Sequence, residues 1–190
     1  MSMTARSVAL CGAALAFGSP LARAEEPRFG LQLHASLPTG DLKNAVDNKP
    51  GAGLGAHMTF DLGSGHVLRP RLDAVFFSEG AFNGFKTKAR DLSLGGDYLY
   101  FPAGRPEGLY LTAGLGLHRW TVDTTTPAVG SAPETSGTQS SSRFGYAAGF
   151  GFQFNRSVGA ELRYVSTHYA NQTAWDPGAN SVQAGLTYRF

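Results

Sequence analysis

The chain has 190 residues, enough for one domain, and 42% of them are hydrophobic, with 25 glycines and 12% aromatic residues. No apolar run approaches the roughly 20 residues that a membrane-spanning helix needs, and so much glycine and aromatic side chain favours an all-β fold. The formal net charge is only +2, so the composition predicts no nucleic-acid partner.

The first 24 residues have the three parts of a secretory signal peptide. Arg6 supplies the positive charge, residues 8–17 form a short apolar stretch, and residues 22–24 (Ala-Arg-Ala) resemble a cleavage site. We therefore expect a cleaved signal peptide (1–24) and one mature domain (25–190). A lipoprotein would use Cys11, but Leu10 before it is too bulky for the usual lipobox. Since Cys11 is the only cysteine, the mature domain has no thiol chemistry.

Eight segments of the mature domain alternate apolar residues with polar residues or glycine, which predicts half-buried β-strands. These segments are residues 29–36, 52–62, 68–76, 91–100, 109–118, 144–154, 158–164 and 182–190. Their lengths suit tilted strands that cross a bilayer.

The connections between these segments alternate in length. Residues 63–65, 102–108 and 155–156 form short connections, whereas residues 37–50, 79–88, 121–142 and 168–179 form long ones. The third long connection is rich in Thr, Ser, Gly and Pro, and we expect an unpacked loop there. Short turns in the periplasm and long loops outside are typical of outer-membrane barrels. An even strand number then predicts that both termini are periplasmic.

The polar face of the segments indicates which solvent the apolar face meets. Nine nearly balanced charges lie on it: Asp61, Arg69, Arg71, Asp73, Asp91, Asp97, Glu161, Arg163 and Arg189. Most strand glycines share this face, and small residues suit a narrow interior but make a poor outer surface. We therefore predict a paired charge network in the lumen and lipid around the apolar face. A soluble barrel, the alternative, would have to pack nearly all the large residues inside.

The aromatic residues gather near both ends of the segments, as in the two interfacial girdles of membrane barrels. On the short-turn side lie Phe29, Phe60, Tyr98, Tyr100, Phe152, Phe154, Tyr188 and Phe190, and on the other side lie Phe76, Trp120, Phe144, Tyr146 and Tyr164. The predicted fold is all-β, an eight-stranded antiparallel up-and-down transmembrane β-barrel. The barrel must be closed, because hydrocarbon offers no hydrogen-bond partner to the backbone groups at an open sheet edge. Pro70 cannot donate a ladder hydrogen bond, so we expect a β-bulge there.

The last five residues alternate apolar side chains and close on a terminal phenylalanine. This end, with Leu186, Tyr188 and Phe190 as its apolar positions, is similar to the signal recognised by the outer-membrane barrel assembly machinery. Residues 30–33, 38–41 and 68–72 add to a resemblance to the outer-membrane β-barrel domain family, often called the porin family, with OmpA/OmpX-type small barrels. The resemblance implies a monomer in the bacterial outer membrane, with lipid, lipopolysaccharide and the assembly machinery as partners. It implies no particular activity, because the family is functionally mixed.

The interior of an eight-stranded barrel is just wide enough for its own side chains. We therefore expect the nine charges to form a structural salt-bridge core, with a narrow ion path as the alternative. His34, His57 and His118 share the inward face, and we expect them to be hydrogen-bonded rather than to bind a metal. No cofactor is predicted.

One family of small barrels removes acyl chains from lipid A with a His, a Ser two residues later and an acid. The nearest stretch here, residues 167–171, has Ala170 at the serine position, so the nucleophile is missing. We therefore expect no enzyme, and a structural role in the envelope or a surface-interaction role through the outer loops. Lys86, Lys88 and Arg90 lie where a long loop meets a strand, where they could pair with lipopolysaccharide phosphates.

Overall fold

The computed structural model of the protein describes residues 26–82, 85–128, 133–168 and 178–190. The predicted signal peptide therefore lies outside the described residues and stays an expectation. The elements in chain order are β1 (Arg28–Thr39), α1 (Gly40–Ala45), β2 (Gly51–Gly63), β3 (His66–Phe77), β4 (Gly80–Phe82), β5 (Phe85–Tyr100), β6 (Gly108–Thr126), β7 (Thr135–Gln153), β8 (Val158–His168) and β9 (Ala179–Arg189).

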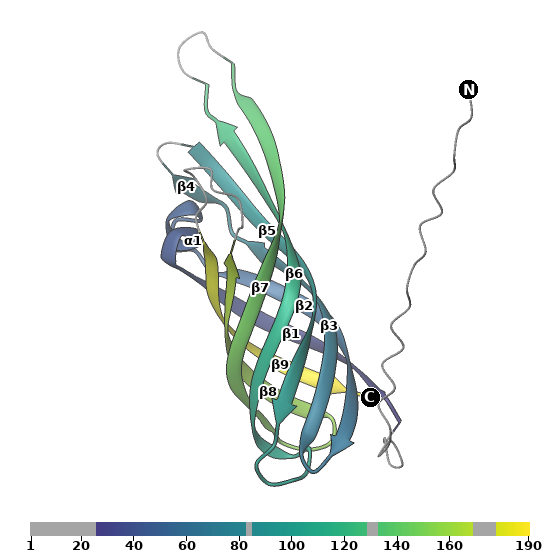
Figure 1. Ribbon diagram of the computed structural model, residues 1–190. Helices are drawn as coiled ribbons and strands as arrows, with labels where there is room; N and C mark the ends of the chain where they lie inside the picture. Colours follow the sequence, from purple (N-terminus) through teal and green to yellow (C-terminus); the bar gives the residue numbers. More distant parts are fainter. Residues whose placement is uncertain (1–25, 83–84, 129–132, 169–177) are drawn as a thin grey trace, which may run out of the picture.

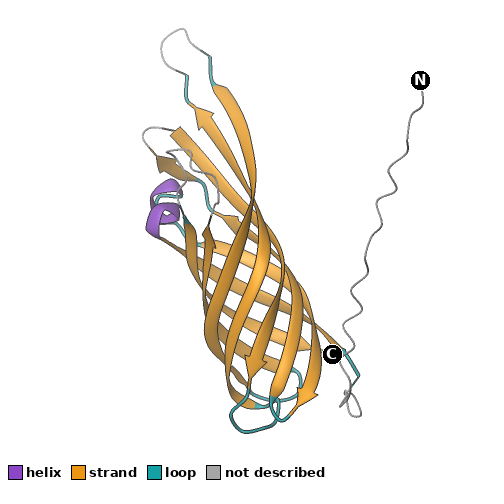
Figure 2. Cartoon of the chain, viewed as in Figure 1, coloured by secondary structure: helices purple, strands orange, loops and turns teal. Residues whose placement is uncertain are grey.

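Eight of these strands form a closed antiparallel barrel (Figures 1 and 2). Each of β1, β2, β3, β5, β6, β7, β8 and β9 pairs with the next, and β1 pairs with β9 from Gly30↔Arg189 to Thr39↔Asn180. The short β4 pairs with β5 outside this ring. The predicted eight-stranded barrel is confirmed. The described part of the chain contains no helix with the length and hydropathy of a membrane span.

The large apolar side chains point outward. Leu33, Leu94 and Leu117, in the middle of three strands, are 68%, 64% and 62% exposed. The alternate positions are buried and hold the arginines, the acids and many glycines. The predicted orientation, with the apolar face toward lipid, is therefore confirmed. Trp120 is an exception to the predicted outer girdle, because it is 6% exposed and points inward.

The barrel has two different ends. The short connections β2–β3, β5–β6 and β7–β8 and the C-terminal residue lie at one end, which we call the turn end. β1, β3, β6 and β8 end at the other, the loop end (Figure 2). At the turn end, Asn155 holds the β7–β8 connection, because its Oδ1 accepts hydrogen bonds from the backbone N–H of Ser157 (2.9 Å) and of Val158 (2.8 Å).

The third long connection differs from the prediction of an unpacked loop. β6 and β7 stay paired in one register as far as Thr126↔Thr135, so this hairpin projects beyond the rest of the barrel (Figure 1). The prediction was wrong for residues 121–126 and 135–142. Threonine has a high β-propensity, and each added pair extends a ladder that the barrel has already nucleated. The first long connection likewise contains α1, and the second contains β4 and the start of β5.

The expected bulge at Pro70 is absent. The β2–β3 register is the same on both sides of this residue, and the pairing only skips Met58 and Thr59 opposite Pro70 and Arg69. The register shift lies instead at Asp61/Gly63, beside the turn. The missing N–H of the proline thus interrupts the ladder without adding a residue to it.

Candidate functional site

A connected network of ion pairs fills the middle of the barrel. Asp97 Oδ2 accepts hydrogen bonds from Arg69 (2.7 Å), Arg71 (2.8 Å) and Arg163 (3.2 Å). Glu161 accepts a hydrogen bond from Arg69 Nη2 at 2.5 Å, and Asp73 accepts one from Arg71 Nε at 2.6 Å. Three guanidinium groups therefore balance three carboxylates from β3, β5 and β8. Such pairing offsets the large cost of removing these charges from water.

Three of the nine predicted lumen charges lie apart from this network. Asp91 contacts Nδ1 of His118 at 2.7 Å, nearer the loop end. Arg189 donates a hydrogen bond to the side chain of Gln153 near the turn end. Asp61 is partly exposed beside the β2–β3 turn, where its carboxylate accepts a hydrogen bond from the N–H of Gly63.

Two neutral side chains that the sequence pattern does not identify complete the network. The hydroxyl of Tyr110 donates to Glu161 at 2.9 Å, and the amide of Gln32 donates to Asp73. Both residues occupy inward positions of their strands, so the alternation placed them correctly. Because both side chains are neutral, the sequence does not identify them as partners of the charged groups. The stagger of the strands around the barrel places them beside the network.

The inward glycines make room for these polar side chains. A Cβ atom added to Gly114 would lie 2.0 Å from Oδ1 of Asp97, and one added to Gly151 would lie 2.3 Å from the ring of Tyr110. A Cβ atom on Gly53 would likewise overlap the ring of His34. Each of these three inward side chains therefore lies over a glycine of the neighbouring strand.

Buried apolar residues lie on both sides of the charge network. Near the turn end, Val67, Leu99, Phe101 and Tyr110 form one cluster, which we call the inner apolar layer. Near the loop end, a second cluster forms the outer apolar layer, made of Leu42, Val46, Val75, Phe77, Ala89, Trp120 and Ala179. Leu42 and Val46, in α1 and directly after it, bring the first loop into this layer, so the loop end of the lumen is filled.

The lumen leaves little room for water or ions. Two cavities that border the network have volumes of only about 10 and 20 Å³, which is about enough for one water molecule each. The buried ring nitrogens of His57 have no hydrogen-bond partner among the protein atoms. Among the described residues, no group of three His, Cys, Asp or Glu side chains could hold a metal ion.

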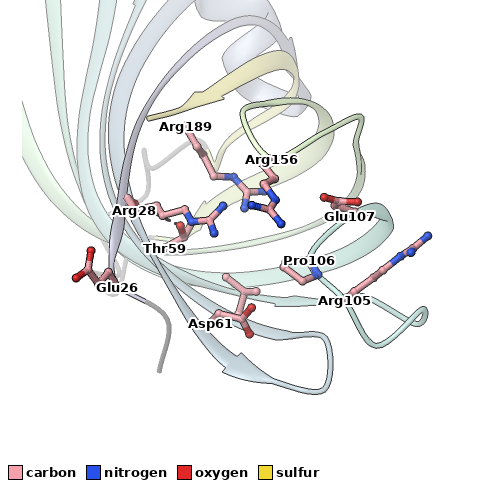
Figure 3. A pocket seen from close by; sticks show the side chains of 10 residues that line it. Glu26, Arg28, Thr59, Asp61, Arg105, Pro106, Glu107, Arg156 and Arg189 are labelled. Carbon is pink, nitrogen blue, oxygen red and sulfur yellow. Dashed lines mark hydrogen bonds between the residues drawn. The ribbon is translucent and has the colours of Figure 1, made fainter. Parts of the chain in front are cut away.

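A larger cavity of about 300 Å³ opens at the turn end (Figure 3). Four arginines and three acids line this cavity, together with Thr59, Val67 and Pro106; the charged ones are Glu26, Arg28, Asp61, Arg105, Glu107, Arg156 and Arg189. Val67 belongs to the inner apolar layer, so that layer separates the cavity from the charge network.

The remaining predicted residues lie at the two ends of the outer surface. Lys86, Lys88 and Arg90 are exposed on the outward face of β5 at the loop end. The terminal apolar positions are exposed near the turn end: Leu186, Tyr188 and Phe190 are 61%, 50% and 70% exposed. His168 ends β8, and residues 169–171 of the deacylase-like stretch lie outside the described residues.

A closed eight-stranded barrel with an apolar exterior and a charged interior defines the class of small outer-membrane β-barrel proteins. In agreement, residues 8–190 match the family described as outer membrane protein beta-barrel domain. The chain belongs to this family, and its location is the bacterial outer membrane. No curated protein sequence matches the chain significantly.

Several solved structures are similar to this barrel. Neisserial surface protein A is 12% identical, with a TM-score of 0.60 over 88% of this chain and 99% of that chain. Ail, the attachment invasion locus protein of Yersinia pestis, is 13% identical, with a TM-score of 0.58 over 86% and 97%. The N-terminal barrel of OprF from Pseudomonas aeruginosa is 12% identical, with a TM-score of 0.57 over 88% and 100%. At such identities the likeness shows the fold alone.

Proposed function

We propose that this protein is a non-enzymatic, monomeric barrel that holds a rigid sheet outside the cell for contact with other molecules or cells. The observation that carries the proposal is the projecting sheet formed by β4, the start of β5, the end of β6 and the start of β7. Of the similar structures, Ail is named an attachment protein and the neisserial protein is named a surface protein. Both names are in keeping with such a role.

The projecting sheet has one covered edge and one open edge. β4 pairs with β5 at one side, whereas none of the described residues forms a ladder with Thr135–Ser142 of β7 on the side away from β6. This edge contains no proline and no lysine, and its register has no bulge. Those are the features with which proteins usually protect a strand edge. An extended segment of another polypeptide could therefore add to it as a further strand.

The orientation in the membrane follows from the asymmetry of the two ends. Outer-membrane barrels have short turns in the periplasm and longer loops outside. The turn end, with both ends of the mature domain, is then periplasmic, and the projecting sheet is extracellular. The exposed Leu186, Tyr188 and Phe190 lie near the periplasmic end, where the barrel assembly machinery would recognise them.

A basic surface lies where the projecting sheet leaves the membrane. Lys86, Lys88 and Arg90 lie beyond the lipid-facing Leu92 on the outward face of β5, toward the loop end, and Arg119, which pairs with Leu92, adds a fourth exposed cation. Glu79 lies 3.2 Å from Lys88 and Asp123 lies 3.4 Å from Arg90, so each of these two cations already has a carboxylate partner. Guanidinium and ammonium groups at this height can bind the phosphates of lipopolysaccharide. Such contacts would give the protein a structural role in the envelope, in addition to its proposed role in surface contact.

An acyl-transfer activity lacks a nucleophile in the sequence, because Ala170 stands where the lipid A deacylases have serine. The interior is also a poor candidate for catalysis, since its polar groups are buried behind two apolar layers. We therefore propose a binding role and no reaction.

The test is a variant without the projecting hairpin. Thr121 and Ser140 are register partners, so an Asn-Gly turn in place of residues 122–139 should close the hairpin near the membrane. A control variant keeps both strands and has a scrambled tip (127–134). Both should fold, which heat-modifiable migration on a detergent gel reports.

Cells with the shortened barrel should adhere to other cells and to solid surfaces no better than cells without the protein. Cells with the scrambled tip should adhere like the wild type. Adhesion of the shortened variant at the wild-type level would contradict the proposal. Lipid A from the same strains should keep its full acyl mass, and a lost acyl chain with the wild-type protein would contradict the absence of an enzyme.

A further inference from the structure

The outer part of β7 presents an uncharged strand edge. Residues 135–142 are serines, threonines, one glycine and one glutamine, and all of them are exposed except the half-buried Ser141. Within the described chain, no segment forms a ladder with them on the side away from β6. The backbone N–H and C=O groups on this side are therefore available to a further strand.

This edge is extended before any partner arrives. β7 stays in one register with β6 up to the end of β6, and the hairpin projects beyond the other strands (Figure 1). The hydroxyls of Thr121 and Ser140 lie 3.2 Å apart across the two strands, and the hydroxyl of Thr138 donates to Asp123 at 2.6 Å. A partner strand that is equally preformed loses little entropy on pairing, whereas a flexible peptide has to be ordered. A second copy of the same edge meets this condition.

The charges at the ends of the edge select the direction of such a pair. Glu134 is exposed directly before the edge. In a parallel pair in register, the two Glu134 side chains would lie side by side and repel. In an antiparallel pair centred on Thr138, they stand at opposite ends, roughly 25 Å apart at about 3.4 Å per residue, which exceeds the Debye length of about 8 Å. Each Glu134 then lies opposite Ser142 of the other copy, one strand away from its exposed Arg119.

We propose that the edge of β7 binds the same edge of a second copy of this chain, antiparallel, across two facing membranes. An antiparallel pair of identical strands has a two-fold axis perpendicular to the strands, and this axis turns the second barrel upside down. Barrels in one membrane all point the same way, so each stays a monomer there and its partner lies in another cell. The inference rests on the proposed function and names the partner of the projecting sheet.

An extended segment of an unrelated protein is the other occupant that a strand edge accepts. Specificity for such a segment comes from pockets for its alternate side chains, and residues 135–142 contain no apolar residue to line one. In the antiparallel pair centred on Thr138, Ser136 of each copy lies opposite Ser140 of the other. Cross-strand hydroxyl pairs of this kind stabilise a sheet, so the observations favour a second copy.

Aggregation of phosphatidylcholine vesicles that contain the purified barrel, in about 0.15 M salt, tests the proposal. Vesicles with the wild type should aggregate, which energy transfer between donor-labelled and acceptor-labelled vesicles reports. They should not capture vesicles without protein. Capture of empty vesicles would mean that the hairpin binds lipid and would overturn the proposal, as would the absence of aggregation.

The double variant Ser136→Lys, Ser140→Lys places lysines along the edge, where like charges of two copies meet. Its aggregation rate should fall at least about tenfold. The matched control Thr121→Lys, Thr125→Lys adds the same charge to the register partners of these serines on β6 and should stay within about twofold of the wild type. Heat-modifiable migration shows that both variants fold. Equal rates for the two variants would refute pairing through the edge.

A third variant, Ser136→Glu, Ser140→Glu, separates pairing between copies from local damage to the hairpin. Vesicles with this variant alone should not aggregate. A mixture with the edge-lysine vesicles should aggregate again, because opposite charges then meet across the edge. A mixture that stays dispersed would contradict self-pairing.

This inference and the proposed function fail in different ways. If wild-type vesicles stay apart, or aggregate only after a cell-surface extract is added, while cell adhesion still depends on the hairpin, the partner is another polypeptide. The self-pairing is then wrong and the surface role stands. If the shortened barrel adheres like the wild type and the vesicles also stay apart, both are wrong.

Discussion

Asp97 accepts hydrogen bonds from Arg69, Arg71 and Arg163, and Glu161 joins Arg69 to the hydroxyl of Tyr110. All of these side chains are buried, so water does not solvate their charges. The arrangement is stable only because each charge has a partner, since an unpaired buried charge costs far more than a pair stabilises. At the residue scale the network is therefore sensitive to the loss of any one carboxylate.

Glu161→Gln keeps the shape of the side chain and removes one of the three negative charges of the network. Three arginines then face two carboxylates, and we expect the free energy of unfolding to fall by about 3–5 kcal/mol. Urea unfolding in phospholipid vesicles measures this change. The matched control is Asp123→Asn, whose partner Arg90 lies 3.4 Å away with both side chains exposed; it should cost less than about 1 kcal/mol. Equal effects of the two variants would refute the structural role of the network.

At the scale of a single element, β5 combines two environments. Its outward face carries Leu92 and Leu94 in the membrane and Lys86, Lys88 and Arg90 beyond it. Alternation continues through both parts, so the strand does not end where the lipid ends. The change from leucine to basic residues marks the height of the membrane interface at the loop end.

Replacing Lys86, Lys88 and Arg90 together by glutamine should weaken lipopolysaccharide binding about tenfold, since each exposed contact contributes about 0.5 kcal/mol. Binding of purified lipopolysaccharide to the detergent-solubilised barrel, measured by fluorescence titration, checks this. The double variant Lys86→Arg, Lys88→Arg keeps the charges and should bind like the wild type. If the glutamine variant binds as tightly as the wild type, these three cations do not hold lipopolysaccharide.

At the scale of the whole molecule, the sequence predicts the features that depend on neighbouring residues in the chain. A period of two determines the eight strands and their two faces, and the choice of solvent follows from which face holds the charges and glycines. The sequence does not predict which charges form ion pairs. Arg69 and Glu161, for example, are far apart in the chain and come into contact only through the stagger of the strands. Nor does it predict the projecting hairpin, since residues such as Thr124 and Ser136 form strand only by extending an existing ladder.

The inward residues of β3 show the layers of the lumen in order. Val67 lies in the inner apolar layer, Arg69, Arg71 and Asp73 in the charge network, and Val75 and Phe77 in the outer apolar layer. An ion that crosses the barrel must pass all three layers in series. Each apolar layer opposes the entry of a charge, and the network has no free volume for a hydrated ion.

We therefore expect no ion conductance from the purified barrel in planar bilayers, and this outcome separates the proposed surface role from a narrow channel. The double variant Leu42→Ser, Val46→Ser makes the outer layer polar, yet it should stay closed because the charge network and the inner layer remain. A large porin in the same bilayers gives the positive control, because barrels of 16–18 strands enclose an aqueous pore. Reproducible conductance steps from folded wild-type protein would contradict the closed lumen. Steps from the double variant alone would mean that the outer layer is the only barrier and that the charge network conducts ions.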